Sequence, residues 1–387
     1  MIAIPEQGQD WPALKQALLE AKARDYSWKR GRMAVFFYYL DEALERIQQE
    51  AYMTFWTENN LGQRAFPSLA RLEGEVVQMG LSLMQAPEGA GGTFTSGGSE
   101  ANTMALMGAP VERLIVSAVE HPSVLEAAKA SGKPVEFIPV DHNGIVDRAA
   151  LEAMLKGPKA LISVMLANNE TGVIQPVAEI VRMAGGHLVH TDAVQALGKI
   201  NVNFGLLGVG MMTLSAHKPG GPVGAGALIV RDGLAISPLI HGGGQELRRR
   251  AGTENLVALS GFGAVAQAKL NVKPLRDRLE AALEGAVIFG QGVERLPNTT
   301  CFAMPGMNAE TLLMAFDLEG VAVSSGSACS SGKVAKSHVL AAMGAAPEIS
   351  RAAIRVSLGW DTTETNIDHF TAAWRKIRDR HKARAAA

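Results

Sequence analysis

A single cysteine, Cys329, lies in the run SSGSACSSG at residues 324–332. Serine, glycine and alanine build backbone that approaches other groups closely rather than packing into a core. The Cys329 thiol is therefore expected to be exposed and able to ionise, and a thiolate is a nucleophile. Taken alone, a cysteine in such a loop is as often a bystander as a catalytic residue.

A lysine in the run LSAHKPGGP, residues 214–222, strengthens the case for chemistry. Lys218 follows Ser215 and His217 and precedes a Pro/Gly turn, so it lies outside the interior of a helix or strand. One interpretation is a solvated surface lysine. The other is a Schiff-base lysine, with Ser215 and His217 beside a phosphate, and this predicts an acidic partner for a pyridine nitrogen elsewhere in the chain.

An aspartate with suitable placement ends the apolar run LVHTD at residues 188–192. Ligands of parallel α/β sheets bind at the carboxyl ends of strands, which is where Asp192 is expected. An aspartate at a strand end is also often a helix cap. The order Asp192, Gln195, Lys218 favours the cofactor site.

A glycine-rich stretch, GTFTSGGSEAN at residues 92–102, is suited to hold a phosphate. Its glycines allow close backbone approach, and Ser99 can donate its hydroxyl. A helix is expected from residue 101, and a helix N-terminus favours an anion. The alternative is an ordinary glycine-rich turn with a serine cap.

Together these segments resemble a known enzyme family. The runs TSGGSEAN, VEHPSVL, ANNETGV, HTDAVQALGK, SAHKPGGPVGAGAL, GGGQELRRRAGTEN, SSGSACSSG and IRVSLG are similar to those of NifS/IscS-type cysteine desulfurases. Members of that family are pyridoxal-phosphate enzymes of fold type I in the class V aminotransferase group. The resemblance runs from about Thr93 to the C-terminus.

The resemblance implies roles around the cofactor ring. Lys218 would carry pyridoxal 5'-phosphate as a Schiff base and, once displaced, shuttle protons as a catalytic base. Asp192 would pair with the pyridinium nitrogen, and His121 would stack on the ring as a further catalytic residue. Asn169 and Gln195 would bind the phenolic oxygen of the ring.

The resemblance also implies a phosphate site. Gly98, Ser99, Ser215 and His217 would hold the phosphate within one subunit. Thr253 would reach the phosphate of the neighbouring subunit, so the family pattern implies a homodimer with shared sites.

On the substrate side, Arg355 would bind the carboxylate of L-cysteine together with Asn169, because a guanidinium fork suits a carboxylate. An arginine on an edge strand is the ordinary alternative. Cys329 would attack the sulfur atom and become a persulfide, leaving L-alanine. An iron-sulfur scaffold or another sulfur-acceptor protein is the implied partner.

The first ninety or so residues depart from the family. The Asn-Ala-Thr-Thr-Pro-like opening of cysteine desulfurases is missing, and the segment instead resembles group II decarboxylase-like enzymes such as sphingosine phosphate lyase. Two alternatives therefore stay open: a pyridoxal-phosphate lyase or decarboxylase whose substrate the N-terminal segment selects, and a binding protein that keeps the fold without the activity.

Composition is typical of a cytoplasmic enzyme. A net charge of -1 over 387 residues gives no electrostatic support for binding nucleic acid or a membrane surface. Two cysteines argue against a disulfide framework, and Cys301 is expected to be structural. From its sequence the chain is expected to lack a signal peptide, a membrane span and a metal-spaced Cys/His cluster.

Hydrophobic periodicity predicts an α/β protein, because apolar runs alternating with helical segments from residue 114 to 230 indicate a mostly parallel sheet covered by helices. The family resemblance implies that this is the seven-stranded type of sheet of fold type I. This large domain is expected to span residues 38–262. A smaller α+β domain, with strands around 299–302, 321–323 and 353–356, is expected over 263–387, and residues 1–37 are expected to pack against it or against the partner subunit.

Overall fold

The structure of the 387-residue chain is a computed structural model. The residues that the structure describes are 10–23, 25, 42–54, 67–253, 255, 258, 262, 270–326 and 336–385.

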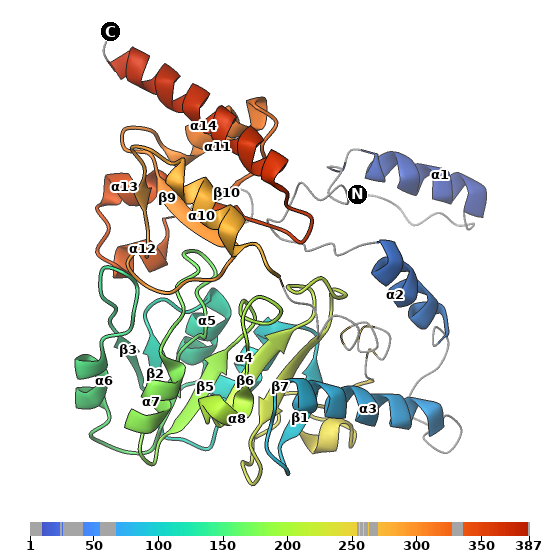
Figure 1. Cartoon of the computed structure of the whole chain (residues 1–387). Coiled ribbons are helices and arrows are strands. Elements are labelled where there is room, and N and C mark those ends of the chain that lie inside the picture. The colour runs from blue at the N-terminus through green and yellow to red at the C-terminus, as the bar shows by residue number, and fades with distance from the viewer. Residues whose placement is uncertain are drawn as a thin grey trace, which may run out of the picture.

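A seven-stranded sheet forms the larger part of the molecule (Figure 1). Its strands are β1 (Gly91–Thr95), β2 (Arg113–Ser117), β3 (Val135–Ile138), β4 (Ala160–Ser163), β5 (Leu188–Asp192), β6 (Met211–Ser215) and β7 (Gly226–Val230), in the order β1-β7-β6-β5-β4-β2-β3. All neighbouring pairs are parallel except those of β7, which runs antiparallel to both β1 and β6. The predicted mostly parallel sheet is therefore confirmed.

Successive residues of the central strands pack into two different cores. Leu114, Leu161 and Leu188 belong to the cluster that includes residues of α4 (Gly98–Gly108) and α5 (Pro122–Ala130). The following residues, Ile115, Ile162 and Val189, belong to the other cluster. That cluster includes residues of α6 (Arg148–Met154), α7 (Val177–Met183) and α8 (Phe204–Leu207), together with Leu81 of α3 (Pro67–Leu83). Because strand side chains alternate between faces, helices cover the sheet on both sides.

A second, antiparallel sheet has the order β10-β11-β9-β8. Its strands are β8 (Val287–Ile288), β9 (Thr299–Ala303), β10 (Ser324–Ser325) and β11 (Ala353–Ser357), and its helices are α10 (Lys273–Ala281), α11 (Ala309–Leu318), α12 (His338–Ala342), α13 (Pro347–Arg351) and α14 (Glu364–Ala385). Phe302 and Phe316 pack against Phe370 and Trp374, with ring centroids 5.1–6.5 Å apart. This aromatic cluster gives the smaller sheet a hydrophobic core of its own.

The smaller sheet corrects one prediction. Residues 321–323 were expected to be a strand, but the strand β10 is Ser324–Ser325. Apolar character favoured 321–323, whereas pairing with Arg355 and Ile354 of β11 selects the two serines. The expected division after residue 262 stays a prediction; in its support, Phe262 packs in a core of the large sheet and Leu270 in the core of the small one.

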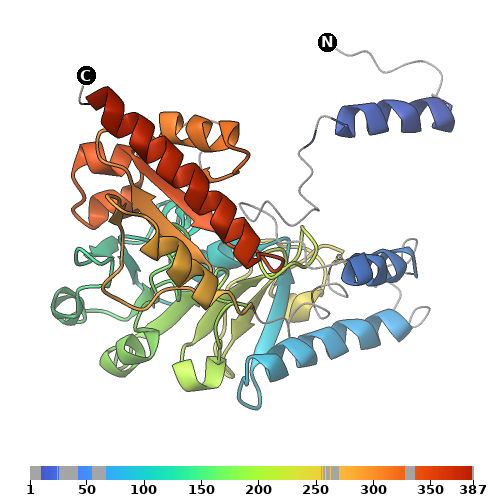
Figure 2. The ribbon, with the colours of Figure 1, turned by 45° about the horizontal axis from the view of Figure 1, so that its top comes forward.

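Two N-terminal helices, α1 (Trp11–Lys22) and α2 (Glu42–Thr54), extend away from both sheets (Figure 2). Helix α1 contains no buried residue, and the Trp11 side chain is 62% exposed. Residues 1–9, 24 and 26–37 lie outside the described residues, so the expected packing of residues 1–37 against the smaller domain or the partner subunit stays a prediction. Among the described residues, no helix is long and apolar enough to cross a membrane.

Candidate active site

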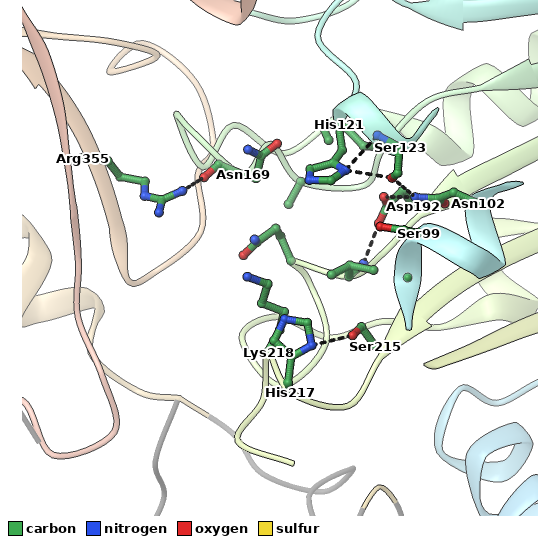
Figure 3. Close-up of a pocket in the computed structure, with 15 residues that line it drawn as sticks. Ser99, Asn102, His121, Ser123, Asn169, Asp192, Ser215, His217, Lys218 and Arg355 are labelled. Carbon is green, nitrogen blue, oxygen red and sulfur yellow. Dashed lines mark hydrogen bonds between the residues drawn. The ribbon is translucent and has the colours of Figure 1, made fainter. Parts of the chain in front are cut away.

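A cavity of about 240 Å³ opens at the carboxyl ends of β5 and β6. The structure brings most of the predicted site residues together around it, because the parallel strands place their carboxyl ends at one edge. The predicted residues that line it are Gly98, Ser99, His121, Asn169, Asp192, Gln195, Ser215, His217, Lys218 and Arg355. Figure 3 shows Arg355 on one side of this space and Asp192 on the opposite side, with Lys218 between them.

Asp192, the last residue of β5, is buried and held by two hydrogen bonds. Asn102 Nδ2 donates to its Oδ2 atom at 2.7 Å, and the backbone amide of Val194 donates to its Oδ1 atom at 2.9 Å. Both bonds orient the Asp192 carboxylate, whose oxygens can accept a further hydrogen bond from a cationic ligand.

The hydrogen bonds continue from Asp192 to His121 (Figure 3). The second proton of Asn102 Nδ2 is directed to Ser123 Oγ at 2.9 Å, and Ser123 Oγ lies 2.8 Å from His121 Nδ1. The backbone amide of Ser123 also donates to His121 Nδ1 at 3.1 Å, so this nitrogen is an acceptor. A neutral His121 consequently carries its ring proton on Nε2.

His121 is positioned by the start of helix α5. It is the N-cap residue, and Pro122 occupies the first helical position, where its missing amide proton costs no hydrogen bond. Burial lowers the pKa of the His121 imidazole, and Lys218 and His338 add to this shift while Asp192 opposes it. His121 is therefore neutral at physiological pH.

Lys218 and His217 follow β6 directly. His217 Nδ1 lies 2.9 Å from Ser215 Oγ, the last residue of that strand. Burial, followed by the charges of Lys218 and Lys199, lowers the pKa of His217 to about 4. While this bond is made, the pair has one proton to donate to an anion: the Nε2 proton of His217 when Ser215 donates to Nδ1, or the hydroxyl proton of Ser215 when Nδ1 carries the ring proton.

The N-terminus of helix α4 lies at the same cavity. The helix begins at Gly98, earlier than the predicted residue 101, and its N-cap Gly97 has φ of 152°, a conformation that favours glycine. Gly98, Ser99 and Asn102 line the cavity from this helix. Unpaired amides at the first turn and the helix dipole make this end a site for an anion such as a phosphate.

Arg355 enters from β11 of the small sheet (Figure 3). Its Nη1 atom donates to the backbone oxygen of Asn169 at 2.5 Å. The residue is buried, and β11 is an interior strand between β10 and β9, so the edge-strand alternative is wrong. Asn169 Oδ1 is buried and has no hydrogen-bond partner among the described residues.

These residues fit pyridoxal phosphate. The α4 N-terminus and the hydrogen-bonded pair Ser215–His217 supply donors for a phosphate. Asp192 supplies a carboxylate for a pyridinium, and Asn169 has a buried oxygen at the cavity without a hydrogen-bond partner among the described residues. When bound, this cofactor draws electrons from the α-carbon of an amino acid joined to it.

Of the predicted residues that the structure describes, Thr253 is not part of the cavity lining. Thr253 is exposed. Its loop is tied to the β1–α4 turn, because Arg250 Nε donates to Glu100 at 2.9 Å and Phe94 donates to Glu246 at 3.0 Å. Its role toward a partner subunit stays a prediction. Cys329 lies outside the described residues.

Sequence reasoning missed Asn102 and Ser123, which connect Asp192 to His121. One signal was present: Asn102 is four residues after Gly98, so both lie on the same face of helix α4. Cys301, expected to be structural, is fully buried on β9, and burial raises the pKa of its thiol.

The fold and the cavity define a pyridoxal-phosphate-dependent transferase of fold type I, and comparisons with known proteins agree. Residues 81–370 match the family model of class-V aminotransferases. A cysteine desulfurase from Sinorhizobium fredii is 41% identical over 314 residues, which are 74% of this chain and 81% of the relative. The cysteine desulfurase IscS of Dictyoglomus turgidum is 40% identical, over 71% of this chain and 76% of the relative.

Among solved structures, a NifS-like protein from Rickettsia africae superposes with a TM-score of 0.78 at 32% identity, covering 90% of this chain and 99% of that one. The chain belongs to the class-V aminotransferase family and, within it, to the NifS/IscS-type cysteine desulfurases. The likeness of residues 1–90 to decarboxylase-like enzymes stays a prediction.

Proposed function

We propose that this protein converts L-cysteine to L-alanine and transfers the sulfur atom to Cys329 as a persulfide. The observation that carries the proposal is the opposed arrangement of the cavity, with Asp192 and Lys218 on the large-sheet side and Arg355 on the other. Such an arrangement suits a ligand that has a pyridinium at one end and a carboxylate at the other.

In this proposal Lys218 carries the cofactor and afterwards moves protons at the substrate carbons. Asp192 binds the pyridinium nitrogen, and neutral His121 lies against the ring with its Nε2 proton available. Arg355 binds the substrate carboxylate, with Asn169 beside it, and thereby orients the sulfur atom away from the guanidinium.

The rest of the cavity holds the cofactor. Gly98, Ser99, Ser215 and His217 bind its phosphate, and Asn169 and Gln195 bind its ring oxygen. A second subunit contributes Thr253, and the enzyme acts as a homodimer.

The sulfur transfer balances without an outside oxidant or reductant. The Cys329 thiolate attacks the substrate sulfur, an S–S bond forms and the C–S bond breaks. The electron pair of the broken bond stays with the substrate carbon, which takes up a proton and leaves as L-alanine. The persulfide is then passed to an acceptor, for which an iron-sulfur scaffold or another sulfur-acceptor protein is proposed.

Product analysis with L-cysteine and a reductant tests the proposal. The wild type is expected to release alanine and sulfide in equal amounts, and Cys329→Ala is expected to bind the cofactor but release no sulfide. Cys301→Ala is the matched control and should retain sulfide release. Borohydride reduction should label Lys218, and a label on Lys199 would contradict the assignment. Carbon dioxide release without sulfide would instead favour the decarboxylase alternative.

A further inference from the structure

A buried lysine, Lys199, lies next to the cavity without lining it. Its side chain is almost fully enclosed, and the residue as a whole is 6% exposed. Its Nζ atom donates to Gln195 Oε1 at 2.7 Å, four residues earlier in the chain. Gln195 itself is half-buried and lines the cavity. Lys199 therefore contacts a residue that lines the cavity without lining the cavity itself.

The chemistry of the two groups fixes the direction of the Gln195 carboxamide. A lysine amine has N–H groups to donate in both its charged and its neutral form, and it takes the oxygen of the amide. With the oxygen held by Lys199, the NH2 group of Gln195 is the part left for a ligand in the cavity. The ring oxygen of the bound cofactor requires such a donor.

Lys199 lies in surroundings that make a hydrogen bond to its amine important for stability. Burial, followed by the charge of Arg355 on β11, lowers the pKa of Lys199 to about 7. The Lys199 charge in turn contributes to the lowered pKa of His217, which follows β6. A buried amine is costly unless it is hydrogen-bonded, so Lys199 and the Gln195 oxygen hold each other in place.

We propose that Lys199 is a positioning residue for the cofactor, which acts by holding the Gln195 carboxamide with its NH2 group toward the ring oxygen. This inference rests on the proposed function, in which Gln195 binds that oxygen. Lys199 itself does not touch the cofactor. Its effect should therefore disappear when Gln195 can no longer make the bond.

A spectroscopic double-mutant cycle tests the inference on the loaded enzyme. The variants are Lys199→Met, Gln195→Leu and the double variant, and Lys376→Met on α14 is the matched control. The measurement is the pH at which the visible absorption band of the bound cofactor changes. A ring oxygen that loses its donor keeps a proton to higher pH, so Lys199→Met should raise this midpoint by about half a pH unit to one unit.

The cofactor dissociation constant, followed by fluorescence quenching, should rise about three- to tenfold in Lys199→Met, because one hydrogen bond is lost. Gln195→Leu should show a similar or larger change in both quantities. In the double variant the Lys199 substitution should add nothing further. Lys376→Met should match the wild type.

Three results would overturn the inference. Equal shifts from Lys199→Met with and without Gln195 would mean that Lys199 acts through its charge alone. If the midpoint is unchanged in Lys199→Met but shifted in Gln195→Leu, Lys199 has no positioning role, while the proposed role of Gln195 stands. If the midpoint is unchanged in Gln195→Leu, the roles proposed for Lys199 and for Gln195 are both wrong. Circular dichroism of each variant checks that the fold is retained.

Discussion

The large-sheet side of the cavity and its small-sheet side are built in different ways. On the large-sheet side, Asp192, Asn102, Ser123 and His121 form a connected set of hydrogen bonds. On the small-sheet side, Arg355 reaches the cavity from β11 and donates to a backbone oxygen, that of Asn169.

This difference separates the two tasks of the enzyme. Connected side chains hold each other in fixed positions before any ligand binds, which suits a cofactor that stays bound. A guanidinium presents five N–H groups in a planar fork whose geometry matches a carboxylate, which suits a substrate that comes and goes. Substitutions on the two sides should consequently affect different measured constants.

The largest effect is expected from Asp192→Ala. Without the Asp192 carboxylate the cavity has no negative charge to pair with a pyridinium nitrogen. Turnover should therefore fall at least about a thousandfold, and the cofactor should bind weakly. Steady-state kinetics and cofactor titration measure both. Asp147→Ala is the control, because Asp147 caps α6 and does not line the cavity. Near-normal turnover in Asp192→Ala would contradict the assignment of the large-sheet side to cofactor binding.

On the small-sheet side, Arg355→Leu should raise KM for L-cysteine about a hundredfold, because a buried charge partner of a carboxylate is removed. Cofactor affinity should change less than about twofold, which is the expected separation of the two sides. The exposed Arg351→Leu in α13 serves as the control. A large loss of cofactor affinity in Arg355→Leu would mean that the sides are not separate.

A smaller effect is expected from Asn102→Ala, which removes the donor shared by Asp192 and Ser123. Cofactor affinity should fall about tenfold, since a hydrogen bond to a charged group is lost, with KM for L-cysteine nearly unchanged. Thr103→Ala is matched to it, because the neighbouring Thr103 hydroxyl bonds to the Ser99 oxygen instead. Equal changes in the two variants would show that the connection through Asn102 is unimportant.

The smallest effect on turnover is expected from Glu170→Gln. Ser337 Oγ donates a hydrogen bond to Glu170 Oε2, and burial raises the pKa of Glu170 to about 7. The folded state therefore holds this proton more tightly than the unfolded state, whose pKa is about 4.5. The stability that this contributes is full below pH 4.5 and is lost as the pH rises to 7.

Thermal unfolding of the wild type and of Glu170→Gln at several pH values measures this loss of wild-type stability. The variant lacks the titrating group, so its stability relative to the wild type should increase between pH 5 and pH 8, by up to about 3 kcal/mol. Parallel stability curves for the two proteins across this range would rule out the proposed titration.

Much of the fold was predictable because the strands of the large sheet are short apolar runs. Leu114, Leu161 and Leu188 sit in strands expected from sequence, and they are buried. The antiparallel direction of β7 was not predictable, because direction depends on the path of the chain between strands rather than on strand composition.

The cavity was predictable where a residue type has a specific chemistry, as with Lys218, Asp192 and Arg355. Asn102 and Lys199 were assigned no role, because an asparagine or a lysine near a helical turn is common and only tertiary contact selects its partner. Asn102 meets Asp192 because helix α4 and the end of β5 are brought together by the sheet.

The position of β7 has a consequence for the order in which the chain acquires its structure. Strand β1 is the first of the sheet, yet its neighbour is β7, and Gly91 is paired with Val230. The turn before helix α4 rests on the same strand so closely that a side chain at Gly226 would lie 2.5 Å from the backbone of Gly97. During synthesis at ordinary rates, the segment between them takes on the order of ten seconds to emerge from the ribosome. The phosphate end of the cavity must wait for that last strand, so the nascent chain cannot hold its cofactor until β7 has been made.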